Sequence, residues 1–112
     1  MWLADVRDAC NFILSATAGK SYTHYAEDLL LRSAVERQFE IIGEALRRLL
    51  NQEPGLSLRI HEAREIIEFR NFLSHAYHLI DHTVVWGIIA KNVPILRDKV
   101  AEVITERDQA SD

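Results

Sequence analysis

Apolar residues recur at three- and four-residue intervals through nearly the whole chain, and this spacing restricts its fold more than any other feature. Residues 3–17 and 26–50 show it, and so does most of the chain beyond residue 58. The spacing places apolar side chains on one face of a helix, whereas the alternation typical of strands is nearly absent. We therefore expect an all-α protein, an antiparallel bundle of four to five helices without a sheet.

Glycine and proline mark the expected ends of the first two helices. Gly19 follows the first apolar pattern and predicts a helix end, because glycine adopts the left-handed conformation that closes many helices. The stretch SYTH (21–24) is typical of a connector with a capping residue. QEPG (52–55) predicts the end of a long helix over about residues 26–50.

That long helix has two distinct faces. Its apolar face is predicted to contain Leu30, Ala34, Phe39, Ile42, Leu46 and Leu49. Charged residues on its other side are expected to form a solvated face with pairs four residues apart, namely Glu36, Arg37, Glu40, Glu44, Arg47 and Arg48.

Two further helices complete the expected bundle. The third covers about residues 58–76, and the fourth begins near Asp81 or His82 and continues to about Arg107. Pro94 predicts a kink or a break in the fourth helix, because proline lacks the amide hydrogen that a helix interior uses.

Composition narrows the class of protein. The 112 residues, 48% of them apolar, fit one domain over residues 1–108 and a polar tail at 109–112. The net charge of −4 argues against bulk electrostatic capture of nucleic acid, but it leaves room for a local basic site. The lone Cys10 excludes an intramolecular disulfide and is expected in the core of the first helix. With no signal segment or bilayer-length apolar run, we expect a cytoplasmic location.

One polar stretch, RNFLSHAYHLIDH (70–82), concentrates the reactive side chains. On a helix with about 100° per residue, Arg70 and Tyr77 lie together on one flank of the core-facing stripe, and His75 points almost opposite to it. The stripe itself would contain Ile66, Phe69, Leu73, Ala76 and Ile80.

Arg70 and His75 lie roughly 140° apart around an unbroken helix, so they do not converge within one chain. Either the helix ends near His75 and turns the imidazole back, or a twofold axis brings the pair from two chains together. We favour the twofold axis, because the third and fourth helices carry more apolar side chains than one core absorbs. A homodimer is therefore expected from the surplus residues Phe72, Leu79, Ile80, Val84 and Trp86.

An arginine and a histidine together suit metal-free cleavage of RNA. The forked donors of a guanidinium match phosphate oxygens, and an imidazole exchanges protons near neutral pH. One group would help to deprotonate the ribose 2′-hydroxyl that attacks the adjacent phosphate, and another would protonate the leaving 5′-oxygen. From spacing alone, a solvated helix surface is the alternative to such a site.

Three segments resemble one known family. RNFLSHAY (70–77) has the form R-x4-H-x-Y, AVERQFEIIGEALRRL (34–49) is similar to the family's long helix, and VVWGIIAKNVPIL (84–96) is similar to its last helix. Together they cover most of residues 28–100. The chain thus resembles HEPN-domain proteins, and among them the HepT-like toxins of HepT/MntA toxin–antitoxin pairs.

The resemblance implies a dimeric, metal-independent ribonuclease that uses no cofactor. Arg70 and His75 match its catalytic pair, which meets at the dimer cleft, with Asn71 and Ser74 in support. It also implies that a minimal nucleotidyltransferase antitoxin of the MntA type attaches AMP to Tyr77. The added phosphate would lie beside Arg70 and block the substrate by charge and bulk. The alternative is a catalytically silent HEPN-like module that binds a nucleotide or a protein.

Three histidines raise the alternative of a metal site. His75, His78 and His82 fall at i, i+3 and i+7, which is one face of a continuous helix, and Asp81 is nearby. A polar loop between two helices also explains them, with Asp81 or His82 capping the fourth helix. We expect the loop and no metal site, because histidines at such spacing are commonly surface residues.

Overall fold

Helices make up almost all of the part that the computed structural model describes, which is residues 2–75 and 80–110 without the side chains of Ser74 and His75. The elements are α1 (Trp2–Thr17), α2 (Tyr22–Glu27), α3 (Leu29–Gln52), the 3-10 helix η1 (Pro54–Leu58), α4 (Ala63–His75) and α5 (His82–Ala110). No strand occurs in these two segments, so the expected all-α class is confirmed.

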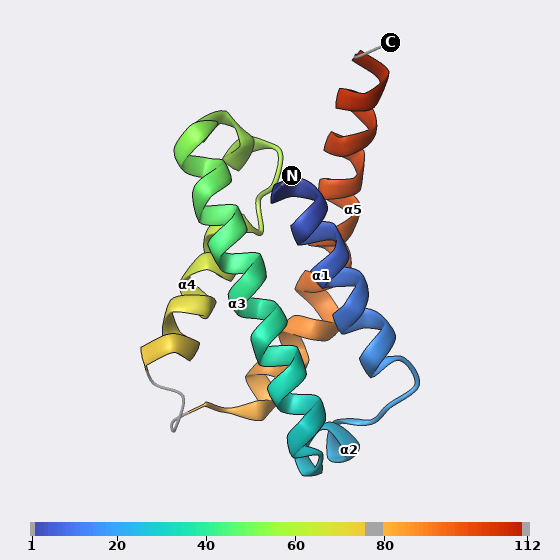
Figure 1. Ribbon diagram of the computed structural model, residues 1–112. Coiled ribbons are helices and arrows are strands. Elements are labelled where there is room, and N and C mark those ends of the chain that lie inside the picture. Colours follow the sequence, from blue (N-terminus) through green and yellow to red (C-terminus); the bar gives the residue numbers. More distant parts are fainter. Residues whose placement is uncertain (1, 76–79, 111–112) are drawn as a thin grey trace.

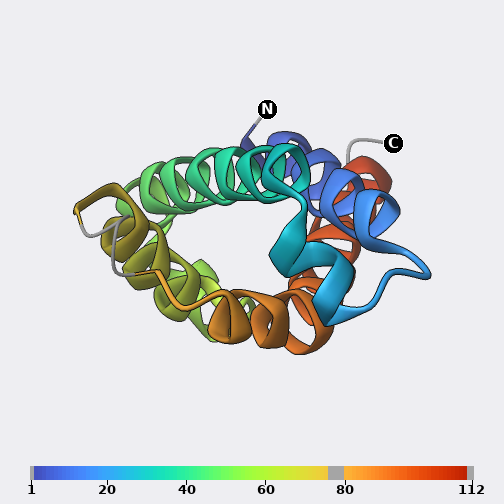
Figure 2. The same cartoon turned by 90° about the horizontal axis from the view of Figure 1, so that it is seen from below.

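The four longer helices form an antiparallel bundle. Figure 1 shows α4, α3, α1 and α5 side by side, with α1 and α4 running down the page and α3 and α5 running up. The view from below in Figure 2 shows the same helices arranged around a ring, with short α2 across one end of α3. Helix α3 packs on both α1 and α4, and α1 also packs on α5. Consequently α3 is the element that connects α4 to the rest of the core.

The helix ends follow local sequence signals. Gly19 adopts a left-handed backbone with φ 72°, directly after the last turn of α1. Ser21 caps α2 by accepting the His24 amide at 3.1 Å, and Asp28 caps α3 by accepting the Leu31 amide at 3.0 Å. Pro54 then opens η1 two residues after α3 ends. These predicted ends are confirmed, whereas the short helix α2 was not predicted.

Two boundaries differ from those expected. The third helix begins at Ala63 rather than near residue 58, because η1 and a turn occupy the preceding residues. Helix α5 passes through Pro94 without a break and continues to Ala110. Figures 1 and 2 show a change of direction along α5 instead, as expected where a proline removes a hydrogen bond and crowds the preceding turn.

The core is a continuous apolar cluster that all four long helices supply. Cys10 is fully buried in it, as predicted, and burial raises the pKa of its thiol to about 12. Of the predicted apolar face of α3, Phe39, Ile42, Leu46 and Leu49 are buried. The prediction for Leu30 was wrong, because its side chain is 83% exposed at the free end of α3.

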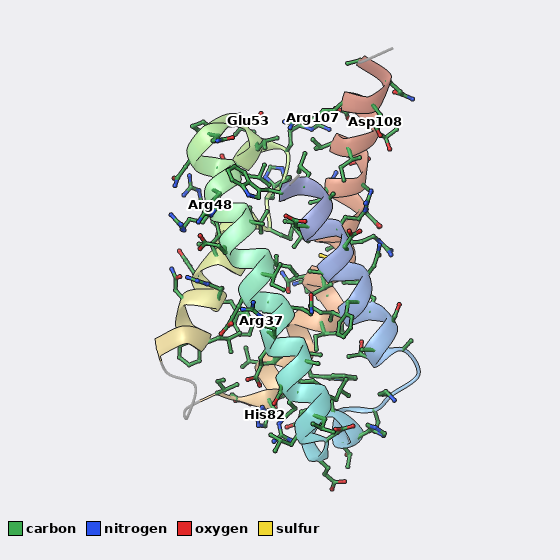
Figure 3. The ribbon with its side chains drawn as sticks, in the orientation of Figure 1. Arg37, Arg48, Glu53, His82, Arg107 and Asp108 are labelled. Carbon is green, nitrogen blue, oxygen red and sulfur yellow. The ribbon has the colours of Figure 1, made fainter. Side chains whose placement is uncertain are left out.

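Ion pairs join the ends of distant segments. Arg107 on α5 pairs with Glu53 after α3, and Figure 3 labels both at the upper end of the molecule. Arg59 binds Glu106 through two hydrogen bonds of 2.9 and 2.6 Å. Among the described helices, none combines the length and apolar character needed to cross a membrane.

Candidate functional site

Helix α4 presents Arg70 to α3. Phe69 meets Phe39 of α3 edge to face, with ring centroids 5.1 Å apart and an interplanar angle of 87°. Ile66 and Leu73 are buried on the same side, as the predicted stripe requires. The helix is thereby fixed by residues on both sides of Arg70, whose side chain lies on the flank of this stripe and is 29% exposed.

The aliphatic stem of Arg70 lies against a glycine. Gly43, in the interior of α3, is buried, and a Cβ placed on it would lie 2.4 Å from the Cβ of Arg70 and 2.5 Å from its Cγ. Contacts of that length do not occur between carbon atoms, so only glycine fits here with both backbones in their present positions. The backbones of α3 and α4 are therefore close together where Arg70 crosses α3.

The guanidinium of Arg70 has one anionic neighbour and one amide neighbour. Its Nη2 lies 3.6 Å from Oε2 of Glu44, and its Nη1 donates to Oδ1 of Asn71 at 3.3 Å. Its Nε is buried and has no acceptor among the described residues. Of the five N–H donors of the guanidinium, those on the two terminal nitrogens that face neither Asn71 nor Glu44 are therefore available to a further ligand.

Three arginines lie around the carboxylate of Glu44. Arg47 and Arg48 donate to its carboxylate at 2.7 and 2.8 Å, and Arg70 approaches from α4. The hydrogen bonds from Arg47 and Arg48 lower the pKa of Glu44 to about 2, so it stays ionised at any physiological pH. Figure 3 labels Arg48 near the upper part of α3. Three cations around one anion give this site a local positive charge in a chain of net charge −4.

Among the other predicted site residues, Asn71 has a described side chain. Asn71 is exposed beside Arg70. Helix α4 is described as far as His75, and residues 76–79 lie outside the described residues, so the arrangement of the Arg70–His75 pair stays a prediction. The side chains of Ser74 and His75, and the whole of Tyr77, lie outside the described residues. The roles predicted for these three residues therefore stay predictions.

Helix α5 begins at His82, directly after Asp81. Asp81 accepts the Thr83 amide on its side chain at 2.9 Å and the Val84 amide on its carbonyl at 3.0 Å, so it caps the helix as expected. Ile80 and Asp81 are not helical, so residues 75–82 do not form the continuous helix that the metal alternative requires. The side chain of His75 and the whole of His78 lie outside the described residues.

A second polar cluster lies where α5 begins, at the position of His82 in Figure 3. The ring of Tyr25 meets those of Trp86 and His82 at centroid distances of 5.3 and 6.4 Å. The hydroxyl of Tyr25 and Nδ1 of His82 are buried without a hydrogen-bond partner among the described residues. Burial also raises the pKa of Glu36 on the neighbouring turns of α3, against the opposing influence of His82 and Arg32. Glu36 is therefore partly buried, as are Glu40 and Glu44 on the predicted solvated face.

Comparison with known proteins identifies the family. The sequence profile of the family described as "Ribonuclease HepT-like" matches residues 6–103. The chain belongs to this family. The HepT-like resemblance inferred from three segments of sequence is thus confirmed, and the matched range includes the whole α3–α4 site.

Relatives of this HepT-like chain carry ribonuclease names. A Thermococcus cleftensis protein named "Probable ribonuclease HepT" is 32% identical over 98 residues, which is 88% of each chain. A Methanocaldococcus jannaschii protein named "Putative RNase MJ1380" is 30% identical over 99 residues, or 88% of this chain and 90% of the relative. No solved structure matches the chain significantly.

Two residues of the site were missed from sequence. Gly43 was assigned to a long helix and Glu44 to its solvated face, and the contact of each with Arg70 was not predicted. A signal for Gly43 was present, because a glycine in a helix interior destabilises it by about 1 kcal/mol relative to alanine and usually has a packing reason. Nothing in the spacing of charges distinguishes Glu44 from Glu40.

Proposed function

We propose that this HepT-like protein is a metal-independent RNA endonuclease that uses Arg70 and His75. One observation carries the proposal: a partly exposed arginine of the family motif is held in a locally positive site built by α3 and α4. A fixed cation with free donors is what a phosphate undergoing transfer requires. The ribonuclease names of relatives of nearly equal length support the coarser part of the proposal, that the protein cleaves RNA.

The proposed reaction is transesterification within RNA. One imidazole removes the proton of the ribose 2′-hydroxyl, whose oxygen then attacks the adjacent phosphorus. The bond from phosphorus to the 5′-oxygen breaks, and a second imidazole donates a proton to that oxygen. Arg70 stabilises the negative charge that develops on the phosphate oxygens. The products are a 2′,3′-cyclic phosphate and a free 5′-hydroxyl.

Each chain supplies one motif histidine, His75, so we include in the proposal a homodimer whose two copies of His75 share the acid and base roles. An apolar groove of about 290 Å³ lies between α4 and the start of α5, immediately beside the motif. Its lining includes Phe72 and Val84, which are 45% and 52% exposed. The molecule measures 47 × 29 × 19 Å, so it is about two helix layers thick and has little interior for these side chains. A second copy seated here would bring the two α4 ends together.

We also propose that the protein is a toxin whose antitoxin is a minimal nucleotidyltransferase of the MntA type. Attachment of AMP to Tyr77 would add an anionic phosphate within the motif that contains Arg70. The adenylate would then compete with the RNA phosphate for the same guanidinium. Coexpression with the nucleotidyltransferase would raise the mass of the protein by one adenylyl group, and Tyr77→Phe would abolish that gain.

The test of the nuclease is cleavage of labelled RNA by purified protein in excess EDTA. We expect cleavage with 2′,3′-cyclic phosphate ends, and none of a substrate that is 2′-O-methylated throughout, since it lacks the nucleophile. Arg70→Ala and His75→Ala should each lower the rate at least about 100-fold while the oligomeric state is unchanged. Full activity in His75→Ala would refute the assignment. Absence of cleavage by the wild type, with measurable binding of a nucleotide or protein, would favour the silent module.

A further inference from the structure

Gly43 lies in the middle of a 24-residue helix, far from either end. Glycine weakens a helix interior because it loses more backbone freedom on folding than other residues. Its φ is not in the left-handed region, so no backbone conformation demands glycine at this position. What demands it is Arg70, whose Cβ and Cγ occupy the space where a side chain of residue 43 would begin.

The atoms that would collide are next to the α4 backbone rather than at a flexible tip. Relief of a 2.4 Å contact requires either that α4 moves away from α3 or that Arg70 changes its first side-chain torsion. The edge contact between Phe39 and Phe69, one turn before Gly43 and one residue before Arg70, opposes the first movement. Either change would carry the guanidinium away from its present place beside Glu44.

We propose that Gly43 is a positioning residue for Arg70: the absence of its side chain creates the slot in which the arginine stem lies, and the slot aims the guanidinium at Glu44 and the substrate phosphate. Glu44 is held in advance by Arg47 and Arg48, so it provides a fixed end point for that alignment. This inference rests on the proposed ribonuclease function and adds a residue that touches neither substrate nor reacting atoms.

The hydrogen bonding of Arg70 agrees with this role. Its buried Nε has no acceptor among the described residues, so no hydrogen bond at Nε fixes the torsions of the stem. The remaining contacts are 3.6 Å to Glu44 and 3.3 Å to Asn71, which are long for charge-assisted hydrogen bonds. Packing in the glycine slot is therefore the main restraint on where the guanidinium points.

The first experiment compares two glycine substitutions. In Gly43→Ala, we expect kcat for RNA cleavage to fall by about 10- to 100-fold with a small change in KM, because a displacement of about 1 Å has that effect on a positioned group. Gly87→Ala is the matched control, since Gly87 is also within a helix and a Cβ there meets nothing within 4 Å. Its rate should stay within about twofold of the wild type. Thermal unfolding of both variants separates misplacement from loss of fold.

A second pair keeps the proposal testable if Gly43→Ala does not fold. Glu44→Gln removes the charge at the end of the slot, whereas Glu106→Gln removes another exposed carboxylate that is paired with an arginine. Binding of RNA that is 2′-O-methylated throughout is measured by fluorescence anisotropy in wild-type and Arg70→Ala backgrounds. We expect Glu44→Gln to weaken binding several-fold in the wild type and to have no further effect once Arg70 is absent. Glu106→Gln should leave RNA binding unchanged in both backgrounds.

The outcomes separate this inference from the function beneath it. If the wild type cleaves RNA and a folded Gly43→Ala cleaves it at the same rate, the positioning role is refuted and the nuclease stands. Equal effects of Glu44→Gln with and without Arg70 would refute it as well, because a general structural role predicts additivity. If the wild type does not cleave RNA, the proposed function fails first and the positioning role fails with it.

Discussion

At the scale of single residues, the chain contains two glutamates whose environments shift the pKa of the carboxyl group in opposite directions. Glu106 is exposed, and its hydrogen bonds from Arg59 lower its pKa. Glu36 is half-buried beside Tyr25 and His82. Burial is the largest influence on the pKa of its carboxyl group and raises it. Ionisation of Glu106 therefore stabilises the fold, whereas ionisation of Glu36 destabilises it.

Replacement of Glu36 should consequently stabilise the protein at neutral pH. A carboxyl whose pKa is raised by folding contributes fully below its unfolded pKa, near 4.5, and loses that contribution as the pH rises through its folded value. Because Glu36→Gln resembles the protonated form, we expect a higher urea midpoint than that of the wild type at pH 7. The two midpoints should converge at about pH 4.

Glu106→Gln is the control with the opposite sign, since it should lower the urea midpoint at pH 7. A decrease in the midpoint of Glu36→Gln at pH 7 would mean that its attraction to Arg32 and His82 outweighs the penalty of its burial.

At the scale of elements, the sequence correctly predicts the features that depend on residues close together along the chain. The end of α1 at Gly19, the cap at Asp81 and the end of α3 before Pro54 all depend on residues within a few positions. The exposure of Leu30 and the contact of Gly43 with Arg70 depend on how α3 meets other helices, and neither follows from spacing along one helix. For the same reason the arginine of the site was found from its motif, while the partners that hold it were not.

The N-terminal cap of α3 offers a test of one element. Asp28 accepts the Leu31 amide at 3.0 Å, and its side chain is 39% exposed. We expect Asp28→Ala to lower the free energy of unfolding by about 1 kcal/mol, as for other helix caps, in urea titrations followed by circular dichroism. Asp28→Asn should retain most of the stability, because an amide oxygen also accepts this hydrogen bond. Equal losses in both variants would instead point to the ion pair between Asp28 and His24.

At the scale of the whole molecule, the site borders on apolar surface. The groove beside the motif is lined by side chains from α4 and from the start of α5, with Ile80 and Asp81 between them. A bundle this thin cannot turn Phe72 and Val84 inward without displacing residues that are already buried. This apolar surface beside the proposed catalytic motif is the basis of the proposed dimer, in which a second chain covers the groove.

Substitution of Phe72 should separate assembly from folding. We expect Phe72→Glu to convert a dimer to a monomer in sedimentation equilibrium, because two carboxylates would be buried across a twofold interface. Thermal stability measured at low protein concentration should change little, since the side chain is already 45% exposed. RNA cleavage should fall with the dimer, because each site would lose the residues of the second chain. Phe12→Glu on α1 is the matched control, as Phe12 is equally exposed but does not line the groove. A Phe72→Glu monomer that cleaves RNA at the wild-type rate would show that one chain suffices, and the shared site would have to be abandoned.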